Sequence, residues 1–306
     1  MPRPLRFKPH GDNVYHHLIS RTVQQRFFLK SAEKDHFLKL LHYYSSIYMV
    51  KLIGFCIMDN HFHIIVKAET SAVYSDAEID KRVSMITNGR RLTSNKCQAK
   101  IARLENISEY MKSIKETFAK WYNRKHDLKG CFWSERFKNT ILQNGTALAQ
   151  CLAYIELNPV RASIAPVPEK YRWSSIYARV RGTAISSVLS FIGLYDEKIT
   201  PFKKALSYYR EYLYACGVRK ISGKGSIPID IAEIEKKSGF SIPKDRVLMG
   251  KVTHFVESCA IGSEDFIDGI YDKISHLGRS STKRKIYDTA LSKDVKSMKR
   301  FCMIRF

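Results

Sequence analysis

The chain has 306 residues, and 44% of them are hydrophobic, which is enough for a core of ordinary size. Its charge is unusual, because 52 Lys and Arg against 29 Asp and Glu give a net charge of +23. Such an excess repels itself in the folded state and predicts a polyanionic partner, with nucleic acid first and an anionic membrane surface second. A basic protein without such a partner remains an alternative.

The sequence has neither the pattern of a membrane protein nor that of a disulfide framework. No segment approaches the roughly 20 consecutive apolar residues that span a bilayer. The basic N-terminus is followed by no apolar run, so it lacks the pattern of a signal peptide. The 7 cysteines are widely spread and none lies in a CxxC pair, which is typical of reduced thiols. We therefore expect a cytoplasmic protein that does not bind a membrane.

The first predicted elements are a strand, a helix and a hairpin. Residues 14–22 (VYHHLISRT) have the composition of a strand, and residues 31–48 carry apolar side chains at helical spacing. Two further apolar and β-branched runs, 50–58 and 61–66, are separated only by an Asp-Asn pair. Because Asp and Asn suit tight turns, these two runs predict a β-hairpin.

The middle of the chain continues the alternation of helices and strands. Residues 69–105 are polar and basic and predict a loop with some helix. Residues 108–125 predict a long amphipathic helix, residues 131–142 a strand, and residues 146–158 a helix that Pro159 ends. The resulting order is typical of an α+β fold in which helices cover one sheet.

A domain boundary is expected near Gly182. Residues 1–182 contain the predicted sheet, and residues 183–306 predict a mostly helical, basic C-terminal extension that is a candidate for DNA contacts. A Gly/Ser/Lys-rich break interrupts the extension at residues 222–226, and the stretch from Lys283 onward is again rich in Lys and Arg. That composition suits phosphate contacts, although a solvated basic face is the commoner explanation.

Two histidines in the second hairpin strand form the first candidate site. Side chains alternate between the faces of a strand, so His61 and His63 point the same way. Two neutral imidazoles on one face can share a divalent ion. Histidines at such positions are more often packing or polar-face residues, so the pattern alone leaves both readings open. No further Cys or His at close spacing indicates a zinc site.

The segment YIELNPVR at residues 154–161 carries the second candidate. Tyr154 and Asn158 are one helical turn apart and face the same side, where they could supply a nucleophile and a hard oxygen ligand. The alternative is a tyrosine at the core edge followed by an Asn at a helix C-terminus, where Asn is favoured. Because Pro159 follows, Asn158 lies at a frayed helix end and ideal geometry does not fix its direction.

The third candidate is the segment GCFWSERFK at residues 130–138. Arg136 and Lys138 alternate onto one face of the predicted strand, and Trp133 could stack on a nucleobase. The alternative is an ordinary amphipathic strand with a buried Trp. The net charge favours the DNA interpretation.

Taken together in order and spacing, these motifs resemble those of the HUH single-tyrosine transposases, and in particular the REP-associated tyrosine transposase branch. The resemblance covers residues 1 to about 180. The motifs that carry it are VYHHLISR (14–21), MDNHFHIIV (58–66), GCFWSERFK (130–138), YIELNPVRA (154–162) and YRWSS (171–175). The segment GSEDFI (262–267) resembles the C-terminal region of longer members of that family.

The resemblance implies a ferredoxin-like α+β fold and a metal-dependent transposase or single-strand DNA endonuclease. It makes His61 and His63 the ligands of Mg²⁺ or Mn²⁺, Asn158 the third ligand, and Tyr154 the nucleophile that forms a 5′-phosphotyrosine. The implied partner is single-stranded or hairpin DNA, and the implied location is cytoplasmic and nucleoid-associated. A monomer and a homodimer are both compatible with the family. The residues expected to contact DNA are Arg21, Trp133, Arg136, Lys138 and Arg161.

Several alternatives stay open at this point. Tyr110, Tyr122 and Tyr171 compete with Tyr154 for the role of nucleophile. A domesticated protein that holds DNA hairpins without cutting them is the second functional hypothesis. An RNA-binding or ribosome-associated basic protein is the third, and it depends on charge alone.

Overall fold

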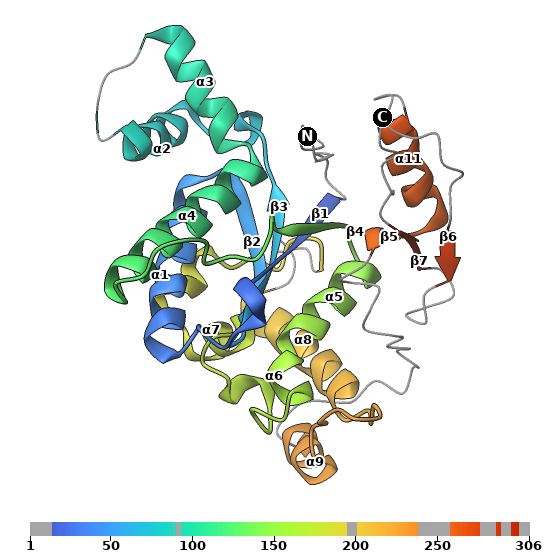
Figure 1. Cartoon of the computed structure of the whole chain (residues 1–306). Helices are drawn as coiled ribbons and strands as arrows, with labels where there is room; N and C mark the ends of the chain where they lie inside the picture. The colour runs from blue at the N-terminus through green and yellow to red at the C-terminus, as the bar shows by residue number, and fades with distance from the viewer. Residues whose placement is uncertain are drawn as a thin grey trace.

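The computed structural model describes residues 14–87, 89, 93–194, 201–237, 258–275, 286–288 and 295–299. At its centre lies one sheet whose described strands follow the order β2-β3-β1-β4-β5-β7-β6 (Figure 1). The strands are β1 (Val14–Arg21), β2 (Val50–Ile57), β3 (His61–Ala68), β4 (Lys138–Gln143), β5 (Ser258–Gly262), β6 (Ile286–Asp288) and β7 (Lys296–Lys299).

The first four strands have the ferredoxin-like arrangement. Strand β3 lies between β2 and β1 and is antiparallel to both, and β1 is antiparallel to β4. A helix connects β1 to β2, a hairpin connects β2 to β3, and a helical segment connects β3 to β4. This order is the one that the resemblance implied, and the α+β fold class is confirmed.

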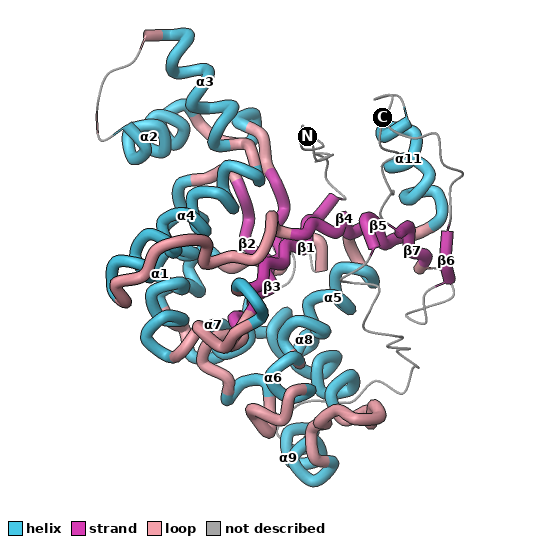
Figure 2. The backbone as a smooth tube through the Cα atoms, viewed as in Figure 1, coloured by secondary structure: helices cyan, strands magenta, loops and turns pink. Residues whose placement is uncertain are grey.

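Helices cover both faces of this sheet. Helices α1 and α4 lie together on one side, and α5 and α8 lie on the other (Figure 2). No helix within the described residues is long and apolar enough to cross a membrane. The helices are α1 (Ser31–Ile47), α2 (Asp76–Thr87), α3 (Ser94–Leu104), α4 (Ile107–Lys125), α5 (Thr146–Glu156), α6 (Asn158–Arg161), α7 (Ser175–Arg181), α8 (Phe202–Gly217), α9 (Ile229–Lys237) and α11 (Glu264–Ser275). Short 3-10 turns lie at Val23–Gln25, Ser71–Val73, Pro168–Lys170 and Ala184–Val188.

The alternation of side chains along the strands divides the core into two layers. Phe62 and Ile64 of β3 pack against α1 and α4, whereas Ile65 packs in the layer that contains α5 and α8. His61 and His63 have the same alternation as Ile65, so they point toward α5. The layer on the α5 side therefore contains both halves of the predicted site.

Helix α5 packs very closely on β2. A Cβ atom added to Gly54 would lie 2.2 Å from Cδ1 of Leu152 and 3.1 Å from Oγ of Ser175. Only glycine leaves room for the helix at this distance. Because Leu152 and Tyr154 belong to the same helix, this contact sets how near Tyr154 comes to the sheet.

Two elements begin or end elsewhere than the sequence predicted. Strand β4 starts at Lys138 rather than at residue 131, because Phe132, Trp133 and Phe137 pack together in the layer between the sheet and helices α1 and α4 instead of alternating between two faces. Helix α5 ends at Glu156, and a separate turn, α6, begins at Asn158 with proline in its first turn. Proline is tolerated there because the first amide of a helix has no intrahelical partner.

The C-terminal extension has the expected helices and also three strands that the sequence did not predict. Strand β5 runs parallel to β4, and β7 and β6 continue the sheet beyond it in antiparallel pairing. Helix α8 places Tyr209 and Leu213 in the same buried cluster as Tyr154. The basic residues 283–285 and the arginines at 90 and 91 lie outside the described residues.

Candidate active site

His61 and His63 lie side by side on the α5 face of β3. Their ring centroids are 5.0 Å apart with an interplanar angle of 84°. His63 is almost fully buried, with 2% of its surface exposed, and His61 is partly exposed. A ligand could therefore reach the pair from the His61 side.

In both histidines the Nδ1 atom already has a hydrogen-bond partner. Nδ1 of His61 lies 2.6 Å from Oδ1 of Asn60, which can only accept, so this nitrogen carries the proton and donates. Nδ1 of His63 lies 2.9 Å from Nε2 of His17. If Nδ1 of His63 likewise donates, the Nε2 lone pair of each ring is left for a ligand, as in histidines whose outer partner fixes the tautomer.

His17 is a site residue that the sequence analysis missed. It lies on β1 opposite Ile65 and is fully buried, with its ring stacked on that of His63 at a centroid distance of 5.1 Å. The signal was present in the VYHHLISR motif, because His17 points to the same face as Tyr15 while His16 points to the other. Finding it required the pairing of β1 with β3, which the strand pattern alone does not give.

Burial keeps the two histidines of β3 uncharged at neutral pH. Loss of solvation lowers the pKa of His61 to about 4, and the positive charge of Arg21 acts in the same direction. The pKa of His63 falls well below its usual value, first through burial and then through the neighbouring histidines and Arg21. Neutral imidazole is the form that binds metal ions, so the pair is ready for that role without a change of protonation.

Tyr154 projects from α5 toward these rings. Its ring centroid is 5.7 Å from that of His63 and 6.5 Å from that of His17, both in edge-on contact, and 9% of the residue is exposed. Burial raises the pKa of the Tyr154 phenol, and Cys151 adds to this effect. Arg21 and Asn158 oppose it. The phenol is therefore protonated at rest, and positive charge near its oxygen favours its ionisation.

Asn158 lies one turn beyond Tyr154, at the start of α6. Its Nδ2 atom is buried and makes no hydrogen bond of standard geometry, although the side chain is near enough to Tyr154 to lower the pKa of that phenol. A buried amide without a partner is unfavourable in a finished structure. Asn158 thus has polar capacity that a bound ligand would satisfy.

The histidine pair offers two neutral nitrogen donors to a divalent ion. Within the part of the chain that the structure describes, no three His, Cys, Asp or Glu side chains come together as a metal site. The atom of Asn158 that lacks a partner is Nδ2, which donates hydrogen bonds and does not bind a cation, so only its amide oxygen could serve as a third ligand. Two neutral imidazoles alone leave further positions open to water or phosphate oxygen. An open shell is typical of catalytic rather than structural metal sites.

The competing tyrosines are engaged elsewhere. The hydroxyl of Tyr110 is buried against Oγ of Ser45 at 2.8 Å in the layer formed by α1 and α4, and Tyr122 packs in that same layer. Tyr171 donates to the carbonyl of Ile57 at 2.7 Å. Among these candidates, Tyr154 alone has ring contacts with the histidine pair.

The turn before His61 is held from two sides. Lys34 of α1 forms a hydrogen-bonded ion pair with Asp59, and its ammonium group also lies over the ring of Trp173, 4.3 Å from the centroid. On the other side Asn60 donates from Nδ2 to the carbonyl of Gln25 at 3.0 Å. The YRWSS motif thus contributes to the site indirectly, through the lysine that fixes this turn.

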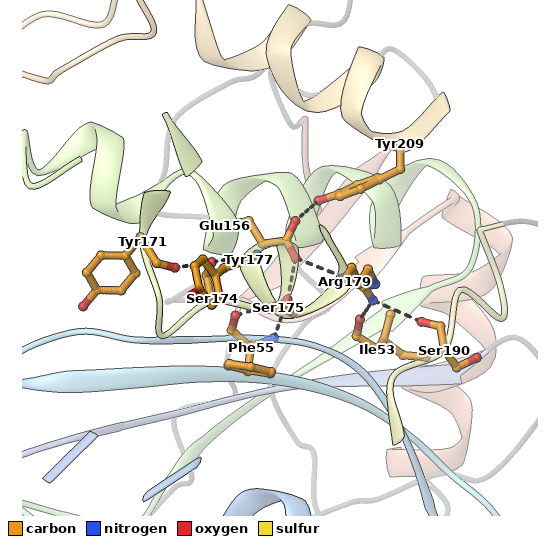
Figure 3. A network of polar contacts seen from close by, with 10 residues as sticks. All are labelled: Ile53, Phe55, Glu156, Tyr171, Ser174, Ser175, Tyr177, Arg179, Ser190 and Tyr209. Atoms are coloured by element: carbon orange, nitrogen blue, oxygen red, sulfur yellow. Dashed lines mark hydrogen bonds and ion pairs between the residues drawn. The ribbon is translucent and has the colours of Figure 1, made fainter. Parts of the chain in front are cut away.

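A buried polar network anchors the helix that carries Tyr154 (Figure 3). Glu156 and Arg179 have no exposed side-chain surface and form an ion pair at 3.1 Å. Tyr209 of α8 donates to Oε2 of Glu156 at 2.6 Å, and Oγ of Ser175 bonds to the other carboxylate oxygen. The guanidinium also donates to the carbonyl of Ile53 in β2. The end of α5 is therefore tied to α7, α8 and the sheet at once.

Two of the residues expected to contact DNA lie on the face of the histidine pair. Arg21 of β1 is directly opposite His61, and Lys138 of β4 is opposite Ile19, which in turn is opposite His63. Arg21 influences the pKa values of both histidines and of Tyr154. Its positive charge would favour a negatively charged group at the site.

The other expected DNA contacts have different surroundings. The indole of Trp133 donates to the carbonyl of Lys115 at 3.0 Å, and its ring packs edge-on against Phe62. Arg161 donates to the carbonyls of Arg219, Gly225 and Cys216 at 2.7 to 2.9 Å, close to the end of α8. Arg136 precedes β4, so it does not share a strand face with Lys138. Trp133 therefore contributes to packing, and Arg161 joins the segment after α6 to the end of α8.

The chain is similar to one family model and to a solved structure. Residues 11–88 match a family model described as "Transposase IS200 like", a segment that includes β1, α1 and the hairpin with His61 and His63. No curated protein sequence matches the chain. A solved structure described as a REP-associated tyrosine transposase bound to a REP hairpin aligns at 13% identity and a TM-score of 0.39, covering 64% of this chain and 93% of that one. Residues 11–88 are therefore similar to the IS200-like transposases, which agrees with the resemblance of the motifs in that part of the chain.

Proposed function

We propose that the protein is a metal-dependent transposase or nickase of the REP-associated tyrosine transposase type. It would cleave and rejoin single-stranded or hairpin DNA through a 5′-phosphotyrosine. The observation that carries this proposal is the contact between Tyr154 and His63, two residues 91 positions apart that the fold brings to a ring distance of 5.7 Å. A protein that only bound DNA would have no chemical use for a buried phenol beside two neutral imidazoles.

The proposed reaction is an exchange of one phosphate ester for another. The phenol of Tyr154 loses its proton as its oxygen attacks the scissile phosphorus, and the bond from phosphorus to the 3′-oxygen breaks. The 3′-oxygen takes up a proton and leaves as a free hydroxyl, while the 5′-phosphate stays on the tyrosine. Because the new ester keeps the energy of the old one, a 3′-hydroxyl can reverse the step and rejoin DNA without ATP.

The chain's own residues prepare this step. Arg21 favours the phenolate of Tyr154 and is placed to hold a non-bridging phosphate oxygen. Asn60 and His17 orient the two imidazoles, and the Glu156 network fixes the helix that presents the phenol. A Mg²⁺ or Mn²⁺ ion held by His61, His63 and Asn158 would supply the charge that polarises the scissile phosphate and stabilises the leaving 3′-oxygen.

The net charge of +23 supports a nucleic acid substrate, because Lys and Arg that neutralise phosphates supply most of the binding free energy in such complexes. We therefore propose DNA as the partner and the cytoplasm, at the nucleoid, as the place of action. The proposed nucleophile and metal ligands all come from one chain, so both a monomer and a homodimer are compatible with this chemistry.

Cleavage of a labelled single strand and of a hairpin with single-stranded flanks tests the proposal. Wild-type protein should nick these DNA substrates in the presence of Mg²⁺ or Mn²⁺, and nicking should stop when EDTA removes the ion. His61→Ala should abolish nicking while hairpin affinity stays within a few-fold, because the basic surface supplies most of the binding. His42→Ala is the matched control, since His42 lies on α1 and bonds to Ser187. Equal nicking by wild type and His61→Ala, or no nicking of any substrate, would exclude the proposed activity.

A further inference from the structure

The loop that connects β1 to α1 presents an aromatic ring to solvent. Phe27 is 69% exposed, the highest value among the large hydrophobic side chains of the described residues. The next residue, Phe28, packs inward against Phe132 and Tyr122. We propose that Phe27 is a stacking platform for an unpaired nucleobase of the DNA strand that enters the active site. This inference rests on the proposed function and adds a binding contact to it.

The loop has a fixed and unfavourable backbone. Gln24 and Gln25 have φ angles of 53° and 54°, in the left-handed region that residues other than glycine rarely adopt. Oγ1 of Thr22 donates to the carbonyl of Arg26 at 2.7 Å, and this hydrogen bond links the two ends of the turn. Strained conformations persist where the surroundings fix them, and they are common at ligand-binding positions. We therefore expect this loop to hold the exposed side chain of Phe27 in one position.

The same loop is fastened to the turn that precedes His61. Asn60 donates to the carbonyl of Gln25 at 3.0 Å, and the amide of Leu29 donates to the carbonyl of Asp59 at 2.8 Å. Asn60 in turn accepts from Nδ1 of His61. Phe27 therefore lies on a loop that is hydrogen-bonded to the turn before His61, so a base held by its ring would bind on the same side of the molecule as that turn.

The positively charged residues near Phe27 favour an anionic ligand. Arg26, its neighbour, is exposed, and Arg21 at the end of β1 lies beside His61. A single exposed ring is too small for a protein docking surface, and the net charge of +23 favours a polyanion. Single-stranded DNA combines phosphates with flat bases, and an aromatic ring next to basic side chains is the usual way to hold it. Bases in a duplex are already stacked, so the contact selects unpaired nucleotides.

Binding experiments in the Tyr154→Phe background test this inference without cleavage. The probes are a short single strand of mixed sequence that carries 2-aminopurine at successive positions, and the matching blunt duplex. Phe27→Ala should weaken single-strand binding by roughly 5- to 150-fold, the range expected for the loss of one stacked base, and leave duplex binding nearly unchanged. Fluorescence quenching of 2-aminopurine should reach its maximum at one position and vanish in Phe27→Ala. Phe27→Trp should retain both the affinity and the quenching.

Two controls make the result decisive. Phe27→Leu keeps an apolar side chain but removes the aromatic face, so it should behave like alanine in quenching. Phe202→Ala removes another exposed phenylalanine, 48% exposed on α8, and should leave single-strand binding unchanged. Equal affinity of Phe27→Ala and its parent for the single strand, or an equal loss for single strand and duplex, would overturn the inference. Nicking by the protein with Tyr154 intact is measured separately, so failure of the stacking site and failure of the proposed reaction are distinguishable.

Discussion

Nε2 of His17 lies 2.9 Å from Nδ1 of His63, and both rings are buried on the α5 face of the sheet. The two residues are on neighbouring strands, and the hydrogen bond fixes how the His63 ring is turned. Outer partners of this kind set the tautomer and the direction of a ligating imidazole. His17 is therefore a positioning residue for the site.

Replacing His17 by Phe should lower the affinity for Mn²⁺ by roughly 10- to 100-fold, the usual effect of losing an outer partner of a ligating histidine. The ring volume is kept, but Nδ1 of His63 loses its partner. Titration of Mn²⁺ by electron paramagnetic resonance measures the affinity, and melting temperature reports any loss of folding. His17→Gln, whose amide oxygen can still accept a hydrogen bond, should recover part of the affinity. Unchanged Mn²⁺ binding in His17→Phe would show that His17 only packs.

The buried ion pair between Glu156 and Arg179 should be essential for stability. Glu156→Gln leaves the guanidinium without its counter-charge in a fully buried place, so unfolding free energy should fall by roughly 3–5 kcal/mol. Urea denaturation measures the change. Asp35→Asn is the matched control, because its pair with Arg172 is partly exposed and should contribute less than about 1 kcal/mol. Similar losses in the two variants would contradict the role given to the buried pair.

Arg161 and Lys138 should differ in their effect on DNA binding. The guanidinium of Arg161 is occupied by three backbone carbonyls, so Arg161→Met should reduce stability and leave the salt dependence of DNA binding unchanged. Lys138→Ala should reduce the slope of log affinity against log salt by about 1, as expected for the loss of one phosphate contact. Fluorescence anisotropy over a range of salt concentrations measures both slopes. A reduced slope in Arg161→Met would restore the original expectation that Arg161 contacts DNA.

The sequence alone was sufficient to predict the hairpin and to place His61 and His63 on one face of a strand, because both predictions depend on local spacing. The ferredoxin-like arrangement followed from the family resemblance, since strand order is set by contacts between distant segments. His17 was missed for that reason: its role exists only once β1 lies beside β3. The local pattern likewise left Tyr154 indistinguishable from a core-edge residue; the family resemblance singled it out, and the fold brings α5 onto the face of the histidine pair.

Other differences between the predicted and the observed strands arise because tertiary packing overrides the local sequence pattern. Residues 131–137 alternate like a strand, but the aromatic side chains of Phe132 and Trp133 gain more by entering the α1 and α4 layer. Strands β6 and β7 have only three and four residues, too few for a periodic signal. Strand β7 pairs with β5 and β6 pairs with β7, so their place in the sheet depends on the edge that β4 offers to β5, which no short stretch of sequence reveals.

The most direct test of the proposed function is the covalent intermediate itself. Wild-type protein incubated with Mn²⁺ and a hairpin that has single-stranded flanks should form a protein–DNA adduct stable to denaturation, and peptide mass spectrometry should place it on Tyr154. Tyr154→Phe should form none, whereas Tyr43→Phe, which alters an exposed tyrosine of α1, should form it normally. An adduct that persists in Tyr154→Phe, or the absence of any adduct on single-stranded and hairpin substrates alike, would contradict a nucleophilic role for Tyr154.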